Sequence, residues 1–485
     1  MSRIAFIAVK EPHMAFGQIG LEIMAAMLSE AGHEVRGLVD RTYDPSPRVT
    51  SDEKRNLHAL KKFKPDFVGF SVLTHRYQWC LKFAHMIKHE LPDTKIIFGG
   101  PHPTAVPERV IAEGCVDIVC IGEGEYAMLE LADDPGRTDI NNLWFWQNGA
   151  IIRNPLRPLI GNLDELPFPM KELWLPAIDR SEFKRYLVMV SRGCPRACTY
   201  CFNSYLHELY RGLGRYTRFR SPDNVIEELK RAREKWEINW LLFMDDNLTL
   251  DPTWFREFAH LYSNHIGLPY ACNIHPLDID EERARLLKES NCRFAMVGLQ
   301  SGSEKVRREI THRYETNDQV RQMARYCHEA GLNFSIDHIF GLDDTPEYLK
   351  ESARLYNELR PFQVNPFFLY YFPKTPIIDI KGGCDIEQIE NGTYQPPTIR
   401  SSRDPKYVSY RNLFDLMPLL PESLVRWLIE TDRVNVLAHV PESVIWLARI
   451  ITNLRGGNTP SIIAHLKFLP HLLLERIRGY RGGFD

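Results

Sequence analysis

Long apolar runs, abundant cysteine and strong net charge are all missing from this sequence. No stretch of about eighteen uninterrupted apolar residues occurs, so a membrane-spanning helix is not expected. The first apolar run, Ile4–Val9, is too short for a signal peptide, and no small-residue cleavage site follows it. The formal net charge is -3 and the first 430 residues contain no basic run, so nucleic-acid binding is not expected. Ten cysteines in 485 residues, without a secretory signal, favour a reducing cytoplasm and metal ligation over disulfides.

What is present indicates a soluble globular protein of several domains. Hydrophobic residues make up 44% and charged residues 25%, which is typical of such proteins. A chain of 485 residues is too long for one ordinary domain, so two or three are expected. The patterns described below divide it into residues 1–133, a linker at 134–185, a third region at 186–375 and a helical region at 376–485.

The first region alternates apolar strands with helical spacing. Helical patterns such as Gly20–Ala31 and Tyr77–His89 separate near-continuous apolar strands, which predicts an α/β fold with a doubly wound parallel sheet covered on both faces. Ligands bind beyond the carboxyl ends of strands in such sheets. The predicted strands are Ile4–Val9, Val35–Val39, Asp66–Val72, Lys95–Phe98 and Asp117–Ile121.

The rhythm stops at about Asp134 and returns at Tyr186. Five prolines between residues 155 and 176 indicate an irregular linker, with a small hairpin at Asn148-Gly149. Six βα units then predict a partial barrel with its site at the strand carboxyl ends. The predicted strands are Tyr186–Val190, Trp240–Met244, Tyr270–Ile274, Phe294–Leu299, Asn333–Phe340 and Val364–Tyr370, joined by helices such as Pro222–Trp236, Pro252–Ser263 and Asp318–Ala330.

Three cysteines stand within eight residues directly after the first of these strands, at Cys194, Cys198 and Cys201. Closely spaced thiolates select zinc or an iron–sulfur cluster. A structural zinc site needs a fourth ligand, and the only close candidate, His207, has a spacing that fits no common zinc pattern. Three ligands to a four-iron cluster leave one iron open, which a cluster that binds its substrate requires. We therefore predict a [4Fe-4S] cluster.

The spacing C-x-x-x-C-x-x-C, with an aromatic residue before the last cysteine, resembles the signature of the radical S-adenosylmethionine (SAM) superfamily. The resemblance covers about Tyr186 to Tyr371 and implies SAM contacts at consecutive strand ends. Read from the residues alone, Asp245 and Asp246 could instead cap the helix near Pro252, and Gly341 could be a plain turn glycine. The SAM-binding positions that the resemblance implies are Tyr200, Phe202, Met244, Asp245, Asp246, Gln300, Ser301, Ile339 and Gly341.

Glycine-rich loops in the first region resemble those of the cobalamin-binding domain that precedes many radical SAM enzymes. With them the chain resembles the cobalamin-binding radical SAM class, which includes the anaerobic magnesium-protoporphyrin ester cyclase and several C-methyltransferases. The resemblance implies bound cobalamin near Glu11, Pro12, His13, Ser71, Leu73, Thr74, Gly99, Gly100, His102, Pro103, Thr104, Gly122, Glu123 and Gly124.

The loop at Glu11–Gly17 departs from the methionine-synthase pattern Asp-x-His-x-x-Gly, in which the His ligates cobalt. Here Glu replaces Asp and the Gly comes one place late. We therefore expect His13 to be a solvated loop residue rather than a cobalt ligand. Members of the resembling class often bind cobalamin without that ligand.

These features give three hypotheses for function. The first is a radical SAM enzyme that forms a 5′-deoxyadenosyl radical and, with cobalamin, methylates an unactivated carbon. The second is a cyclase or oxidative enzyme of the ester-cyclase kind, acting on a tetrapyrrole or lipid, and the third is a non-enzymatic metal-binding scaffold. Methylthiotransfer is disfavoured because the first region has only Cys80, Cys115 and Cys120, on helix and strand patterns.

The expected partners are a small-molecule substrate and an electron donor such as flavodoxin or ferredoxin. Aromatic residues in Phe368–Pro376 pack in the core or line a pocket for an apolar or planar substrate. Cys384, a lone thiol nearby, is either a surface residue or a hydrogen donor. The amphipathic segments Leu419–Ile429, Val444–Leu454 and Ile462–Ile477 predict a helical cap, with contact to a membrane surface as the second interpretation.

Overall fold

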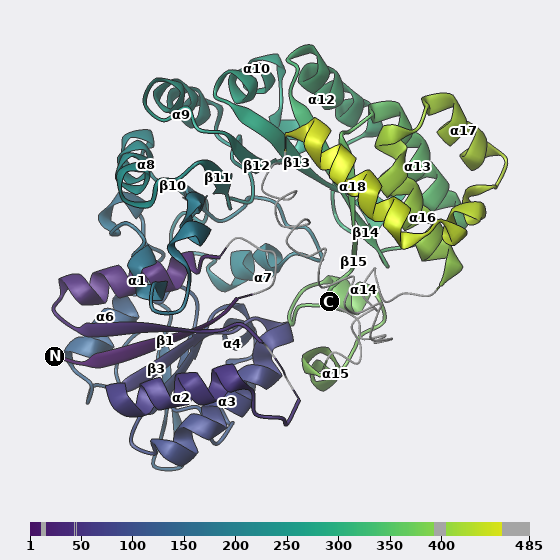
Figure 1. The fold of residues 1–485 in the computed structure, drawn as a ribbon. Coiled ribbons are helices and arrows are strands. Elements are labelled where there is room, and N and C mark those ends of the chain that lie inside the picture. Colours follow the sequence, from purple (N-terminus) through teal and green to yellow (C-terminus); the bar gives the residue numbers. More distant parts are fainter. Residues whose placement is uncertain (11–15, 43, 45, 392–403, 458–485) are drawn as a thin grey trace. The chain divides into compact units, whose positions relative to one another are not determined.

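The computed structural model describes residues 1–485 except 11–15, 43, 45, 392–403 and 458–485 (Figure 1). The chain forms two compact units. The first contains residues 1–187, 201–220 and 371–394, and the second contains residues 188–200, 221–370 and 395–485.

The first unit is built on a seven-stranded sheet in the order β2-β1-β3-β4-β5-β6-β7. Its parallel strands are β1 (Arg3–Val9), β2 (Glu34–Asp40), β3 (Phe67–Ser71), β4 (Lys95–Gly99) and β5 (Ile118–Cys120). The chain moves outward from β1 to β2 and then returns to the other side of β1 for β3. The strand order therefore reverses between β1 and β3, which is the point where this type of sheet binds ligands.

Helices cover both faces of this sheet, as the sequence predicts. Helices α1 (Ile19–Glu30) and α6 (Glu125–Asp133) lie side by side on one face, and α2 (Ser51–Phe63) and α3 (Tyr77–Glu90) lie on the other (Figure 1). Short helices α4 (Pro101–Ala105) and α5 (Pro107–Ile111) follow β4. Apolar side chains of both layers, among them Val68, Phe70, Phe83 and Phe98, form one buried core. The predicted doubly wound α/β fold is confirmed.

The predicted hairpin extends this sheet. Strands β6 (Leu143–Gln147) and β7 (Ala150–Arg153) are antiparallel, and Asn148 and Gly149 between them both have positive φ angles, 52° and 77°. Two such residues are the signature of a type I′ turn. Antiparallel pairing with β5 places the hairpin in the sheet. The segment expected as a linker, 134–185, thus lies in the first unit, where it also forms 3₁₀ turns at Leu163–Glu165, Lys171–Trp174 and Arg180–Lys184.

Six strands in sequential order, β8-β11-β12-β13-β14-β15, form the sheet that gives the second unit its core. They are β8 (Arg185–Val188), where the chain enters this unit, β11 (Trp240–Phe243), β12 (Tyr270–Ile274), β13 (Cys292–Gln300), β14 (Asn333–Phe340) and β15 (Gln363–Phe368). The register of consecutive strands from β11 to β15 is parallel. This open series of βα units is the predicted partial barrel.

A row of helices covers the outside of this sheet (Figure 1). Neighbours in the row contact one another, and each follows a strand of the sheet, as right-handed βα crossovers require. The row consists of α8 (Pro222–Trp236), α9 (Pro252–His265), α10 (Glu281–Glu289), α12 (Asn317–Glu329) and α13 (Pro346–Leu359), and a short α11 (Glu304–Glu309) follows β13.

The described C-terminal helices pack beside the last strand. Helices α16 (Pro405–Leu416) and α18 (Glu442–Gly456) contact β15, and α17 (Glu422–Glu430) contacts α13. They cover the edge strand, which would otherwise expose unpaired backbone groups. No helix among the described residues is long and apolar enough to cross a membrane. The predicted amphipathic segment Ile462–Ile477 lies outside the described residues.

The remaining short elements flank the predicted cysteine site and the end of the sheet. They are β9 (Ser191–Arg192), α7 (Phe202–Leu209), β10 (Arg218–Phe219), α14 (Ile377–Ile380) and α15 (Ile386–Glu390). The last two belong to the first unit, although they follow the barrel in sequence.

Candidate functional site

The three cysteines lie on one loop between β9 and α7. Gly193, with φ of 83°, turns the chain directly before Cys194. Cys198 is buried, whereas Cys194 and Cys201 are partly exposed. Cys201 is also the N-cap residue of α7, so its thiol stands at the end of a helix where the dipole favours negative charge. The loop therefore presents three sulfur donors, one of them at a position that favours a thiolate.

His207, the candidate fourth ligand for zinc, packs its ring on Tyr216 with 4.2 Å between the ring centroids. In the described part of the chain no three His, Cys, Asp or Glu side chains, the three cysteines included, are gathered closely enough to hold a metal ion as they stand. The donor set that the loop offers is three thiols, which suits a four-iron cluster with one open iron.

The segment between α11 and α12 accepts hydrogen bonds from the cysteine loop. Thr199, between the second and third cysteines, donates its backbone N–H to Thr311 O at 3.2 Å and its hydroxyl to Ile310 O at 2.6 Å. Both carbonyls belong to the connection that follows β13. The loop is therefore fixed to the sheet that carries the predicted SAM residues.

Arg313 brings a buried cation to this loop. Its Nη1 lies 3.8 Å from Cys198 Sγ and 3.5 Å from the Tyr200 hydroxyl, and its Nε donates to Glu315 at 2.7 Å. Its Nη2 is buried and has no hydrogen-bond partner. A free buried donor fits an anionic group bound next to the loop. The sequence gives no sign of this role for Arg313, because no local spacing distinguishes it from other arginines.

Asp245 holds the backbone that leads into the loop. Its Oδ1 accepts hydrogen bonds from Val190 N at 3.0 Å, Ser191 N at 2.6 Å and Ser191 Oγ at 2.6 Å. Burial raises the pKa of this carboxyl to about 6. The sequence placed Asp245, Asp246 and Met244 together at the SAM amino group. In the structure the other two are exposed, and only Asp245 is buried with its carboxylate satisfied by the protein.

A second tie joins the loop to the strand ends. Arg196, between the first two cysteines, forms an ion pair with Asp278, and Asn247 donates to the same carboxylate at 2.7 Å. His275, which precedes this aspartate, is buried near both Arg196 and Arg313. Burial and these two cations lower its pKa, so the imidazole is neutral.

Gln300 ends β13 in a left-handed conformation, with φ of 71°. Such a backbone is uncommon for a residue with a side chain, and it concentrates at functional sites. The β13–β14 register shifts between Gly298 and Gln300, which turns this buried side chain out of the strand alternation. Ser301 follows it, and Ser301 O accepts from the buried Arg307 at 2.7 Å. The predicted position of Gln300 and Ser301 at a strand end is what the structure shows.

The next strand carries an acidic residue that no sequence motif marks. Asp337, in the middle of β14, is partly buried and accepts a hydrogen bond from Asn365 Nδ2 at 2.9 Å. Desolvation raises its pKa to about 6. The predicted residues Ile339 and Gly341 follow on the same strand and turn, where Gly341 has φ of 91° and donates to Asp344 at 2.5 Å. A partly buried carboxyl with a raised pKa is a candidate polar contact for a ligand.

In the first unit, the predicted cobalamin loops meet at the carboxyl edge of the sheet. Thr104 Oγ1 accepts from Gly122 N at 3.0 Å, and His102 Nδ1 lies 3.3 Å from Thr74 Oγ1. These contacts lock the loops after β3, β4 and β5 together. The same edge carries the predicted residues Ser71, Leu73, Gly99, Gly100 and Pro103, whereas Glu11, Pro12 and His13 lie outside the described residues.

Several of these side chains are already engaged within the unit. His102 is fully buried, and its Nε2 lies 3.1 Å from Glu390, which also pairs with Arg109. Glu123 accepts two hydrogen bonds from Arg218, at 3.1 and 2.8 Å. Glu123 is therefore engaged by Arg218, and His102 stands against Glu390 although its Nε2 forms no hydrogen bond of good geometry.

Packing explains part of the glycine content of these loops. A side chain at Gly122 would place its Cβ 1.7 Å from the Tyr210 hydroxyl, which itself accepts a hydrogen bond from Glu123 N. A Cβ at Gly124 would lie 3.0 Å from Cys120 Sγ. Gly100 has φ of 96°, and a Cβ there would lie 3.0 Å from Val72 N. Glycine is required at these positions by close packing of the edge itself.

Comparison with known proteins gives matches over both units. Residues 7–132 match the B12 binding domain, and residues 188–356 match the Radical SAM superfamily. An uncharacterized methyltransferase of Pyrococcus horikoshii is 29% identical over 70% of this chain and 73% of its own. The anaerobic magnesium-protoporphyrin IX monomethyl ester cyclase of Cereibacter sphaeroides is 22% identical over 73% of this chain and 58% of its own.

Among solved structures, the fold resembles that of the radical SAM methyltransferase TsrM from Kitasatospora setae, which was solved with tryptophan and a SAM analogue bound. The TM-score is 0.63 at 19% identity, and the similarity covers 78% of this chain and 76% of that one. At this identity the likeness concerns the fold. It extends over both domains in the same order.

Proposed function

Because this chain belongs to the radical SAM enzymes that carry a B12-binding domain, we propose that it is a cobalamin-dependent methyltransferase that methylates an unactivated carbon of a small molecule. The observation that carries the proposal is the three-thiol loop Cys194–Cys201, which stands at the strand carboxyl ends of a radical SAM domain preceded by a B12-binding domain. The match to a methyltransferase over most of the chain supports methylation as the reaction.

The cysteine loop fits a [4Fe-4S] cluster held by Cys194, Cys198 and Cys201. The donor set is three sulfurs with no fourth ligand, and the free Nη2 of Arg313 supplies a hydrogen-bond donor for a nearby anion. A cluster bound there supplies the electron that cleaves SAM. The chain itself fixes the loop by hydrogen bonds. Thr199 donates to the carbonyl of Ile310, and Asp245 accepts from Ser191.

We propose that SAM binds along the strand ends of the second unit. Gln300 and Ser301 are the proposed contacts of its ribose and carboxylate, and Ile339, Gly341 and Tyr200 are the proposed contacts of its adenine. Asp337 joins this set as a partly buried polar group, and Met244 and Asp246 remain the exposed candidates for the amino group.

The carboxyl edge of the first unit fits cobalamin at the β1–β3 reversal point. Cobalamin bound there supplies a methyl carrier. The loops of this edge contact one another, Thr104 with Gly122 and His102 with Thr74, and loops held in this way lower the entropic cost of binding. Purified protein is expected to take up about one hydroxocobalamin per chain. Gly100→Trp is expected to lose most of it, and His13→Ala is expected to retain it.

One experiment tests the reaction. Anaerobically reconstituted protein receives reductant, hydroxocobalamin, methyl-labelled SAM and a fractionated cell extract, and products are separated by mass. The proposal expects 5′-deoxyadenosine, S-adenosylhomocysteine and a product that gains one labelled methyl group. A product that forms a ring or gains oxygen, without label, would assign the chain to the cyclase alternative, which the weaker match to the ester cyclase supports less.

A methylthiotransferase is disfavoured by the structure of the first unit. Cys80 lies in α3 and Cys120 in β5, and all of Cys80, Cys115 and Cys120 are buried. They do not stand together on the loops at the carboxyl edge, where the ligands of a second cluster are expected. The match to the Radical SAM superfamily favours an enzyme over the hypothesis of a non-enzymatic metal-binding scaffold.

A radical SAM enzyme needs a small-molecule substrate and a reductant. We infer flavodoxin or ferredoxin as the electron donor and an apolar or planar substrate, as the aromatic residues after β15 suggest. We also propose a cytoplasmic location, with contact between the C-terminal helices and a membrane surface as the second interpretation of their amphipathic pattern.

A further inference from the structure

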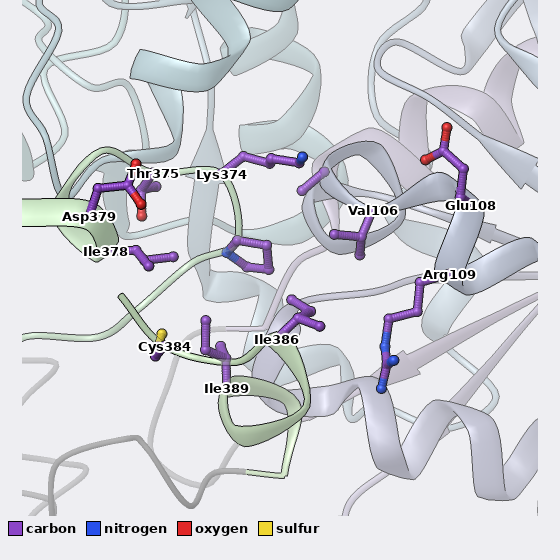
Figure 2. Close-up of a pocket in the computed structure, with 12 residues that line it drawn as sticks. Val106, Glu108, Arg109, Lys374, Thr375, Ile378, Asp379, Cys384, Ile386 and Ile389 are labelled. Carbon is purple, nitrogen blue, oxygen red and sulfur yellow. The ribbon is translucent and has the colours of Figure 1, made fainter. Parts of the chain in front are cut away.

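A pocket of about 580 Å³ lies in the first unit beside helices α4 and α5 (Figure 2). Two stretches of chain line it, 105–109 and 373–389, and both belong to this unit. The volume falls within the range of about 300–1,000 Å³ that is typical of small-molecule sites. None of the residues that we assign to the cluster, SAM or cobalamin lines this pocket.

Both stretches follow the carboxyl end of a parallel strand. Ala105 comes six residues after Gly99, which ends β4, and Pro373 comes five residues after Phe368, which ends β15. Loops at these ends carry the ligand sites of doubly wound sheets and of barrels. The pocket of the first unit is therefore lined by two segments that follow strand carboxyl ends in the sequence.

Apolar side chains form part of the pocket lining. Val106 extends from the α4–α5 side, and Ile386 and Ile389 extend from α15 on the other side (Figure 2). Ile389 is buried, whereas Val106 and Ile386 are partly exposed. An apolar group that enters the pocket would cover these two side chains and exclude water from them.

Charged side chains of both signs stand around the opening. Arg109 is already neutralised, because Glu390 accepts from its Nε and Nη2 at 2.6–2.8 Å. Lys374, Glu108 and Asp379 are exposed and form no ion pair with any residue of the described part of the chain. The rim thus offers one ammonium group and two carboxylates to a ligand.

We propose that this pocket binds a zwitterionic small molecule with an apolar body. The apolar body lies against Val106 and Ile386, the acidic group of the ligand faces Lys374, and its ammonium group faces Asp379. The proposed ligand is additional to the cluster, SAM and cobalamin, because none of the residues assigned to them lines this pocket.

The alkylation rate of Cys384 can report whether a ligand is bound in the pocket. It lines the pocket and is partly exposed, and burial raises the pKa of its thiol. Apart from Cys194 and Cys201, which the cluster would occupy, the other cysteines are buried. In cluster-loaded protein, alkylation by iodoacetamide should therefore occur mainly at Cys384, and a ligand in the pocket should slow it.

Three fluorescent probes that differ only in charge test the proposal. Nα-dansyl-lysine is the zwitterion, dansyl-norleucine lacks the ammonium group, and dansylcadaverine lacks the carboxylate. The zwitterion is expected to bind most tightly and to protect Cys384. Lys374→Met should weaken the two carboxylate probes by roughly two- to fivefold, as expected for exposed ion pairs, and Asp379→Asn should weaken the two ammonium probes to the same extent.

A matched pair of variants tests the apolar wall. Ile386→Glu places a charge inside the pocket and should weaken all three probes more than tenfold, whereas Ile380→Glu, on an exposed residue outside it, should leave them unchanged. The proposal would be overturned by equal affinities of the three probes or by a failure of the zwitterion to protect Cys384. It would also be overturned if Ile386→Glu and Ile380→Glu, both with native circular dichroism, bound the probes with equal affinity. Probe binding needs no turnover, so SAM-dependent methylation of added cobalamin, measured on the same protein, reports separately on the proposed function.

Discussion

Replacing Asp245 distinguishes two roles, an anchor for the cysteine loop and a direct contact to SAM. The buried carboxylate accepts hydrogen bonds from Val190 N, Ser191 N and Ser191 Oγ. Asp245→Ala leaves these donors without an acceptor, and an unsatisfied buried donor costs about 1–3 kcal/mol. We therefore expect a loss of about 3 kcal/mol or more in the free energy of unfolding, together with less iron per chain.

Asp245→Asn is a milder change with a pH signature. The amide oxygen can still accept from Ser191, so we expect a loss of about 1 kcal/mol at neutral pH. Burial raises the pKa of Asp245 to about 6, above its unfolded value of 3.8, so the folded state binds this proton more tightly. The resulting stabilisation is complete below the unfolded pKa and is lost as the pH rises through about 6. The stability difference between Asp and Asn should therefore grow by about 2 kcal/mol from pH 7.5 to pH 4.5.

Urea unfolding followed by circular dichroism measures these differences, and iron analysis and SAM binding are measured on the same preparations. Asp246→Asn, which changes the exposed neighbour, is the control and should shift stability by no more than about 0.5 kcal/mol. If both Asp245 variants keep native stability and iron content but lose SAM affinity, the anchor role is wrong and the carboxylate is a SAM contact.

Three further changes have expected outcomes. Gly122→Ala places a Cβ within 1.7 Å of the Tyr210 hydroxyl at a residue with positive φ, so it should lower the free energy of unfolding in urea by about 1–3 kcal/mol. Gly114→Ala is the control, because the space around Gly114 is open, and it should change the free energy of unfolding by no more than about 0.5 kcal/mol. Equal effects of the two variants would contradict the packing at Gly122. Gln300→Ala should weaken SAM binding to the cluster-loaded protein by roughly two- to tenfold in equilibrium dialysis, and unchanged affinity would place SAM elsewhere. Iron, sulfide and brown absorbance should disappear when alanine replaces all of Cys194, Cys198 and Cys201, and a retained four-iron cluster would refute the ligand assignment.

The sequence by itself determined the fold class and the position of the cluster loop. Near-continuous apolar runs alternate with 3.6-residue helical spacing, and this local pattern gives the strands β1 to β5 and β11 to β15 to within a few residues. The three cysteines are likewise neighbours in sequence, so their spacing alone indicates the chemistry. Asn148-Gly149 predicted its turn for the same reason, since a two-residue turn depends on the φ angles of those two residues.

Only the tertiary structure decided what surrounds these features. Arg313 reaches Cys198 across 115 residues, and Asp245 reaches Ser191 across 54, so no local spacing encodes either contact. A side chain at position 122 would meet the Tyr210 hydroxyl, a contact across 88 residues that the sequence does not indicate. Contacts of this kind arise when separate strand ends meet at one edge of a sheet. Their pairing follows from how the sheet is assembled, whereas the strands themselves follow from the local sequence.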